Sequence, residues 1–174
     1  MLTDLQKKTA QAIVQIFETS RVLGNYGQVT LLRGDTGHLT YGKAQTTLGS
    51  GNLALLIDAY CDAEGAAFAT ELKPYLPRLQ SRDLTLDHDR AFKTLLREAG
   101  DDLVMHDVQD AFFDRVYWQP AMRSLAFIGG TKALTAAVVY DGTVHGSWRA
   151  MRDRTNRKHG KLADLGERSE ERRV

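Results

Sequence analysis

The chain lacks the features that mark a disulfide-bonded, membrane or exported protein. Only one of its 174 residues is cysteine, so no intrachain disulfide can form, and Cys61 within the apolar-rich stretch 53–69 is typical of a small buried side chain. No segment is apolar over the length that a membrane span needs. The first residues, Met-Leu-Thr-Asp, have neither the basic nor the apolar region of a signal peptide. We therefore expect no membrane association, while a removed signal, another export route and a role inside a cell all stay open.

The sequence also lacks a strong charge of either sign and the common cofactor motifs. Its net charge of +1 excludes a strong polyanion binder by composition and gives no global attraction for a polycation. The five histidines are scattered, and no His or Cys pair has the spacing of a zinc site. No phosphate-binding loop, dinucleotide fingerprint or serine nucleophile elbow is present. We predict a protein that works without a metal or cofactor.

The composition predicts one globular domain over residues 1–174. The hydrophobic fraction of 43% and the charged fraction of 26% are ordinary, and the length suffices to bury a core. Residues 147–174 carry nine basic and five acidic side chains, so 149–174 forms a polar, basic tail. Basic tails often bind nucleic acid. However, Trp148 and Met151 also indicate an amphipathic helix followed by a polar end, and we expect no nucleic-acid partner.

An amphipathic helix is predicted from Thr3 to about Ser20. Its apolar residues recur at three- and four-residue steps, at Leu5, Ala12, Ile13, Ile16 and Phe17. Thr3 and Gln6 form a capping box, because the hydroxyl and the amide can each bond a backbone N–H of the first turn. Glu18 lies in the last turn, where the helix dipole and apolar neighbours disfavour a second negative charge, as a general acid requires. The alternative for Glu18 is a solvated carboxylate on the polar face.

A small β-hairpin is predicted after this helix. Two β-prone runs, 29–32 and 39–41, flank the turn Gly34-Asp35-Thr36-Gly37. The alternative for Asp35 is plain turn chemistry, in which its carboxylate bonds its own backbone. A protonated acid and a second carboxylate that activates water are the minimum equipment for hydrolysing a glycosidic bond. The pair of Glu18 and Asp35 therefore indicates a glycosidase.

The rest of the chain is predicted to be mainly helical, which with the hairpin gives an α+β fold class. The expected helices cover 53–71, 84–99, 101–118, 121–127 and 132–140, with Asp83 as a cap and Pro74, Pro77 and Pro120 as breaks. Asp141 is interpreted as a turn residue or as a buried anchor for Arg149 or Arg152. The neighbours Asp87, His88 and Asp89 are expected to be exposed. Tyr26, Tyr41, Tyr117 and Trp118 are candidates for stacking on sugar rings, and Trp118 suits the core equally well.

Several motifs occur in a recognisable order over most of residues 1–146. They are Glu18, the run from Gly34 to Gly42, Gly49-Ser50-Gly51-Asn52-Leu53, Ala99-Gly100-Asp101-Asp102, Gln109-Asp110 with Asp114, Tyr117 with Pro120-Ala121, and Tyr140-Asp141 with Val144-His145-Gly146. This order resembles the family 46 chitosanases of the lysozyme-like superfamily. The resemblance implies a mainly helical, two-lobed fold with a small antiparallel β-sheet beside the active-site cleft.

The resemblance also implies an activity. It implies an endo-acting hydrolase that cleaves the β-1,4 bonds of chitosan, a glucosamine polymer, with inversion at the anomeric carbon. Glu18 matches the family's general acid, Asp35 its general base, and Thr40 the residue that helps place the attacking water. Substrate-binding roles fall to Tyr26, Gly42, Asn52, Asp141 and His145. By family analogy the protein acts outside the cell, as a monomer whose partner is a polysaccharide.

Four features depart from the family pattern. Asn52 stands where the family commonly has an aspartate that contacts a substrate ammonium, and a neutral amide cannot supply that attraction. Gly37 lies where many relatives carry a larger, often basic side chain. His145 follows Asp141 by one residue fewer than in the family. Relatives continue beyond the length of this chain, so a truncated protein is one interpretation. A muramidase-like peptidoglycan hydrolase and a non-catalytic sugar-binding relative therefore remain alternatives.

Overall fold

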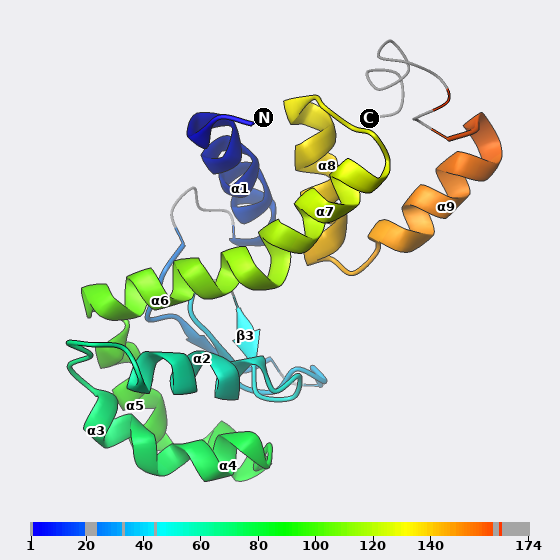
Figure 1. Ribbon diagram of the computed structural model, residues 1–174. Helices are drawn as coiled ribbons and strands as arrows, with labels where there is room; N and C mark the ends of the chain where they lie inside the picture. Colours follow the sequence, from blue (N-terminus) through cyan, green and yellow to red (C-terminus); the bar gives the residue numbers. More distant parts are fainter. Residues whose placement is uncertain (1, 20–23, 33, 44, 162–163, 165–174) are drawn as a thin grey trace. The chain divides into compact units, whose positions relative to one another are not determined.

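The computed structural model describes most of the chain (Figure 1). The residues outside the description are 1, 20–23, 33, 44, 162–163 and 165–174, together with the side chains at positions 18 and 19. The chain forms two compact units, one from residues 1–23 and 114–174 and the other from residues 24–113. We describe each unit by itself. Within the described ranges, no helix combines the length and the apolar character that crossing a membrane demands.

The first unit is built from helices alone among its described residues. Its elements are α1 (Asp4–Thr19), the π-helical turn η3 (Asp114–Trp118), α7 (Gln119–Phe127), α8 (Ala133–Val144) and α9 (Trp148–His159). Helix α8 packs against α1, α7 and α9, as Figure 1 shows for α1 and α7. The buried side chains include Val14, Ala121, Val139 and Tyr140, and the ring of Trp118 meets that of Tyr140 edge-on at 5.1 Å between centroids. Trp118 therefore belongs to the core of this unit.

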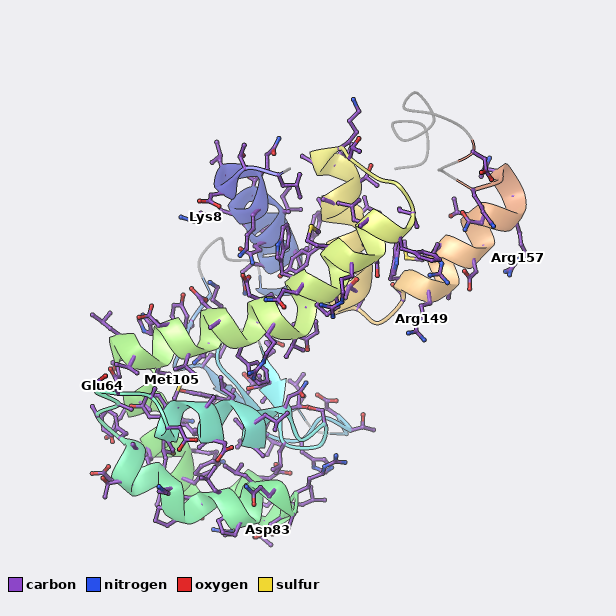
Figure 2. The ribbon with its side chains drawn as sticks, in the orientation of Figure 1. Lys8, Glu64, Asp83, Met105, Arg149 and Arg157 are labelled. Atoms are coloured by element: carbon purple, nitrogen blue, oxygen red, sulfur yellow. The ribbon has the colours of Figure 1, made fainter. Side chains whose placement is uncertain are left out.

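The first and last helices of this unit follow the sequence pattern. The capping box at the start of α1 is confirmed, because the Thr3 N–H donates to Gln6 Oε1 at 2.9 Å and the Gln6 N–H donates to Thr3 Oγ1 at 3.2 Å. The helix predicted in the basic tail is confirmed as α9, from which Arg149 and Arg157 project outward in Figure 2. Most of the tail beyond α9 falls outside the described residues.

The segment predicted as one helix over 101–118 is not a single α-helix. Helix α6 (Leu103–Phe113) is followed in the chain by η3 and then by α7, which has Pro120 in its first turn. Pro120 does not interrupt a helix here, because a first-turn residue has no helical partner for its N–H and the fixed φ of proline suits a helix start. The π-helical turn inserts an extra residue into the helical path and so changes which side chains share a face.

The second unit places a three-stranded sheet against several helices. Strands β1 (Val29–Thr30), β2 (Thr40–Tyr41) and β3 (Thr46–Thr47) are antiparallel in the order β1-β2-β3, with Thr40 paired to both Thr30 and Thr47. The helices are α2 (Asn52–Cys61), α3 (Ala69–Leu72), η1 (Lys73–Tyr75), α4 (Leu76–Gln80), η2 (Leu84–His88), α5 (Arg90–Ala99) and α6. The predicted hairpin of 29–32 with 39–41 is confirmed, and β3 is an addition that the sequence analysis missed. The α+β class is also confirmed.

Three helical boundaries of this unit differ from the prediction. The helix expected over 53–71 ends at Cys61, and a turn with Gly65 at φ 81° precedes α3. Pro74 and Pro77 begin η1 and α4 instead of breaking a helix. The helix expected over 84–99 is divided into η2, which Asp83 caps as predicted, and α5, which Asp89 caps through the Phe92 N–H.

We expect Tyr60→Phe to lower the free energy of unfolding by about 2 kcal/mol and the melting temperature by roughly 4–8 °C. The Tyr60 hydroxyl donates to Asp102 Oδ2 at 2.6 Å and accepts from the Phe68 N–H at 3.1 Å, which fixes the turn between α2 and α3. The bond from Tyr60 holds the pKa of Asp102 below its usual range. Thermal unfolding followed by circular dichroism measures the effect.

The matched control for this variant is Tyr41→Phe. Tyr41 is equally buried, but its hydroxyl finds no hydrogen-bond partner in the part of the chain that the structure describes. Removing an unsatisfied buried hydroxyl should leave the stability unchanged or raise it. An equal loss in the two variants would show that the Tyr60 hydrogen bonds do not hold the turn.

Candidate active site

Asp35 lies in an exposed loop between β1 and β2. We call residues 34–39 the Asp35 loop. The Asp35 side chain is exposed, and its Oδ1 accepts the Gly37 N–H at 2.9 Å, as in the turn chemistry that the sequence suggested. Its Oδ2 has no hydrogen bond among the described residues. The turn therefore uses one carboxylate oxygen and leaves the other available to a solvent molecule.

His38 holds the end of this loop in an unfavourable backbone conformation. Its φ is 59°, in the left-handed region that costs a residue with a Cβ about 1–2 kcal/mol. The ring Nδ1 lies 2.9 Å from Asp87 Oδ2, and Asp87 Oδ1 accepts the Leu39 N–H at 2.8 Å. These two bonds offset the strain. The expectation that Asp87 is exposed was wrong, because only 6% of its surface is accessible.

Thr40 follows this loop on β2. Its hydroxyl donates to the carbonyl oxygen of His38 at 3.3 Å, so the hydroxyl oxygen keeps its lone pairs for a donor such as water. Thr40 is half-buried. The arrangement suits the predicted role of Thr40 in placing water beside Asp35, and that role stays a prediction.

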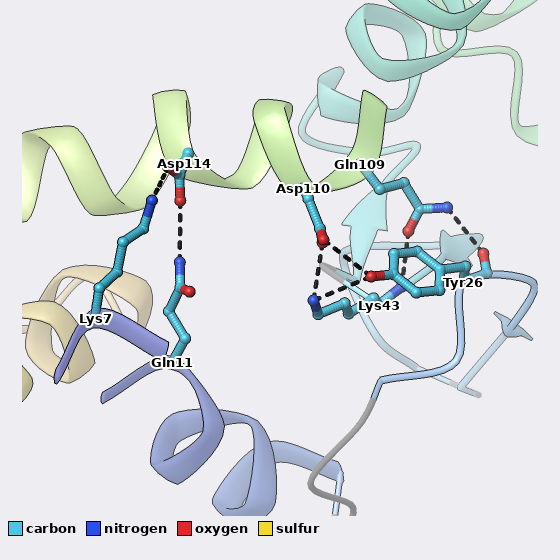
Figure 3. A network of polar contacts seen from close by, with 7 residues as sticks. All are labelled: Lys7, Gln11, Tyr26, Lys43, Gln109, Asp110 and Asp114. Carbon is cyan, nitrogen blue, oxygen red and sulfur yellow. Dashed lines mark hydrogen bonds and ion pairs between the residues drawn. The ribbon is translucent and has the colours of Figure 1, made fainter. Parts of the chain in front are cut away.

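Helix α1 carries Glu18 in its last turn, and the Glu18 side chain lies outside the described residues. The helix itself is fixed within its unit by Asp114 on η3 (Figure 3). Lys7 forms an ion pair with Asp114, and Gln11 Nε2 donates to Asp114 Oδ1 at 3.0 Å. Position 18 follows Gln11 by seven residues, or two helical turns. The backbone that presents Glu18 is therefore anchored two and three turns earlier.

Tyr26 belongs to a second polar network, which lies on α6 (Figure 3). Its hydroxyl donates to Asp110 Oδ2 at 3.0 Å, and Lys43 Nζ donates to Asp110 Oδ1 at 2.8 Å. The ring stacks on that of His106, with 3.9 Å between centroids. Burial raises the pKa of Tyr26. These contacts tie the loop before β1 to α6, and a substrate-binding role for Tyr26 stays a prediction.

Gly42 is required by its backbone conformation and by its neighbour. Its φ is 79°, and a Cβ added there would lie 2.3 Å from Gln109 Oε1. Gln109 is buried, accepts the Lys43 N–H at 3.0 Å and donates from Nε2 to the Tyr26 carbonyl oxygen at 2.9 Å. The glycine thus allows the turn after β2 to approach α6. Contact between Gly42 and a substrate stays a prediction.

The remaining predicted site residues lie on or beside helices α2 and α8. Asn52 begins α2, is half-buried, and has no side-chain hydrogen bond to any described residue. Asp141 lies within α8, so its interpretation as a turn residue was wrong. The ring Nδ1 of His145, at the end of α8, lies 2.9 Å from the Asp141 carbonyl oxygen and 3.4 Å from its carboxylate. Arg152 pairs with its neighbour Asp153 at 2.8 Å.

Burial excludes one of the candidates for stacking on a sugar. Tyr41 has no accessible surface, so it cannot stack on a sugar as the sequence analysis suggested. No cluster of three or more potential metal ligands exists among the described residues.

The chain matches the model of glycosyl hydrolase family 46 over residues 12–171. It belongs to this family. The matched segment includes both Glu18 and Asp35, and it runs from α1 through α9. The resemblance that the sequence motifs suggested is therefore confirmed.

Related members of family 46 carry the name chitosanase. The chitosanase of Bacillus subtilis (strain 168) is 31% identical over 166 residues, which cover 89% of this chain and 58% of the relative. This chain thus spans somewhat more than half the length of the curated relative that it matches. The family 46 chitosanase of Gynuella sunshinyii, solved with chitotetraose, has a TM-score of 0.81 at 27% identity and covers 95% of this chain and 72% of its own.

Two structures from Bacillus subtilis MY002 are similar to the same extent. The native chitosanase has a TM-score of 0.83 at 27% identity, with 99% of this chain and 76% of that chain covered. A single-residue mutant chitosanase complexed with 6 GlcN has a TM-score of 0.80 at 27% identity, with 96% and 73% covered. The fold of this family 46 chain is thus the lysozyme-like fold that the resemblance implied.

The sequence analysis did not assign a role to three residues that shape the site. Asp87 supports the Asp35 loop, while Gln109 and Lys43 hold the turn after β2 against α6. Only Gln109 left a signal in the sequence, because it occupies the same helical face as the apolar Met105 and Phe112, where a polar residue must be bonded.

Proposed function

We propose that this chain is the catalytic part of an endo-acting glycoside hydrolase that cleaves the β-1,4 bonds of chitosan with inversion. The observation that carries the proposal is the Asp35 loop, which presents an exposed carboxylate with one oxygen unbonded among the described residues and is followed on β2 by the oriented hydroxyl of Thr40. Membership of family 46 and relatives named chitosanases support the substrate class. One of those relatives was solved with chitotetraose and another with 6 GlcN.

The proposed reaction is a single displacement. Glu18 donates a proton to the glycosidic oxygen as the bond from that oxygen to the anomeric carbon breaks. A water molecule attacks the anomeric carbon from the opposite face, oriented by Thr40, and gives its proton to Asp35. The product sugar therefore has the inverted configuration. A base that acts through water needs a separation of roughly 6.5–9.5 Å between the two carboxyl groups.

A second candidate substrate is an N-acetylated aminosugar polymer such as peptidoglycan. Asn52 favours it, because its half-buried amide can bond an N-acetyl group or a hydroxyl and carries no charge to attract an ammonium. For either substrate we propose that the protein acts outside the cell, as a monomer, on a polysaccharide.

The deciding experiment compares soluble chitosan, N-acetylglucosamine oligomers and purified cell-wall sacculi as substrates. We expect internal cleavage of chitosan and, by NMR of the first products, an α-anomer at each new reducing end. Release from sacculi without release from chitosan would favour the peptidoglycan hydrolase. A first product in the β-configuration would contradict the inverting mechanism. Oligomer binding by calorimetry with no product after long incubation would identify a non-catalytic sugar-binding protein.

A further inference from the structure

Both carboxylate oxygens of Asp87 bond to residues of the Asp35 loop. Oδ1 accepts the Leu39 N–H at 2.8 Å, and Oδ2 lies 2.9 Å from His38 Nδ1. Lys93 on α5 donates to the carbonyl oxygen of Asp87 at 2.9 Å, so the aspartate is itself tied to a helix. A carboxylate at 6% exposure is unfavourable unless it accepts such bonds. Among the described residues, the bonds that the carboxylate accepts come from two consecutive residues of one loop.

His38 stands between the two groups to which we assign the handling of water. Its N–H donates to the Asp35 carbonyl oxygen at 3.3 Å. Its own carbonyl oxygen accepts the Thr40 hydroxyl at 3.3 Å. The left-handed φ of 59° at His38 therefore sets the backbone relation between the carboxylate of position 35 and the hydroxyl of position 40.

We propose that His38 and Asp87 form a latch, in which the ring and the buried carboxylate hold the Asp35 loop in the shape that catalysis needs. Both are positioning residues, which act through Asp35 and Thr40. This inference rests on the proposed function of those two residues. A displacement of about 1 Å in a reacting group can lower the rate by about 10²-fold.

The residue types support a latch over a simple turn. A left-handed position is adopted without strain by glycine, which would give the same backbone path with no ring. The chain instead has histidine there and places a buried acceptor opposite it. Such a strained conformation persists only where the surrounding structure holds it. Here the bonds from Asp87 hold His38, and they thereby hold the loop.

The test uses the variants His38→Gly and Asp87→Asn in the full chain. His38→Gly removes the ring and relieves the strain, so the melting temperature should stay near that of the wild type. Asp87→Asn keeps the shape of the side chain. In each variant we expect kcat for chitosan to fall by about 10–100-fold while KM changes by less than about threefold. The double variant should be no slower than the slower single variant, because both changes open the same latch.

Two controls match these substitutions. Gln45→Gly relieves an exposed left-handed residue, with φ 50°, in the turn between β2 and β3. Asp89 lies two residues after Asp87. Asp89→Asn removes its ion pair with Arg78 and leaves a side chain that can still cap α5. Both should keep the kcat of the wild type.

Two outcomes would overturn the latch. In the first, the wild type is active and both His38→Gly and Asp87→Asn have a kcat within threefold of the wild-type value. That result would reject the latch and leave the proposed function standing. The second concerns the Leu39 amide, whose hydrogen exchange should be at least about tenfold faster in Asp87→Ala than in the wild type. Unchanged exchange would reject the latch even if the wild type cleaves nothing, whereas inactivity of the wild type on every polymer speaks against the proposed function.

Discussion

Asp35→Asn should lower kcat for chitosan by about 10³-fold while the protein stays folded. General base catalysis is typically worth roughly 10²–10⁴-fold, and an amide cannot take a proton from water. The turn should survive, because an asparagine oxygen can accept the Gly37 N–H as Asp35 Oδ1 does at 2.9 Å. Reducing-end release from chitosan measures the loss, and circular dichroism checks the fold.

Azide distinguishes a lost base from a distorted site. It needs no deprotonation and can attack the anomeric carbon while Glu18 still protonates the leaving oxygen. We therefore expect added azide to restore turnover in Asp35→Asn and to give the glycosyl azide of inverted configuration. Asp35→Ala should respond less well, because it also loses the bond to Gly37. Full turnover of Asp35→Asn without azide would reject Asp35 as the base.

Glu18→Gln should lower kcat for chitosan by about 10³-fold, and the loss should depend on the leaving group. A sugar alkoxide leaves poorly without a proton, whereas 2,4-dinitrophenolate is stable as an anion and leaves without acid catalysis. We expect Glu18→Gln to cleave a 2,4-dinitrophenyl glucosaminide oligomer at nearly the wild-type rate. Asp35→Asn should stay slow on both substrates, because the attacking water still needs a base.

The control for Glu18→Gln is Glu64→Gln. Glu64 is an exposed glutamate in the turn after α2, labelled in Figure 2, and the same substitution there should change neither rate. If Glu18→Gln turned over chitosan as fast as Glu64→Gln does, the assignment of Glu18 as the general acid would be rejected.

Local patterns of the sequence were enough to predict the elements that hold the candidate site. The capping box of Thr3 and Gln6 depends on residues three positions apart, and it forms as predicted. The β-prone runs around the Asp35 turn likewise pair as predicted, with Val29 opposite Tyr41. The motif order then identified the family. These features depend on near neighbours in the chain or on the order of motifs along it.

Features that depend on distant partners were not predictable in the same way. Asp87 is 48 residues from Leu39, and no local pattern says that its carboxylate is buried against that N–H. Pro77 and Pro120 were interpreted as helix breaks, whereas a proline is equally suited to the first turn of a helix, and packing decides between the two. The π-helical turn that begins at Asp114 was likewise not predictable, because its amino-acid composition does not differ from that of an α-helix.

The shortness of the strands has a consequence for engineering. Each strand of the sheet has two residues, so backbone pairing contributes little to the conformation of the Asp35 loop. A transplant of residues 34–40 into another scaffold would therefore lose its shape unless residues 83–93 moved with it, because that second segment supplies the buried carboxylate and the lysine that secures it. The two stretches make one exchangeable module, and homologue shuffling should place no crossover point between residues 34 and 93.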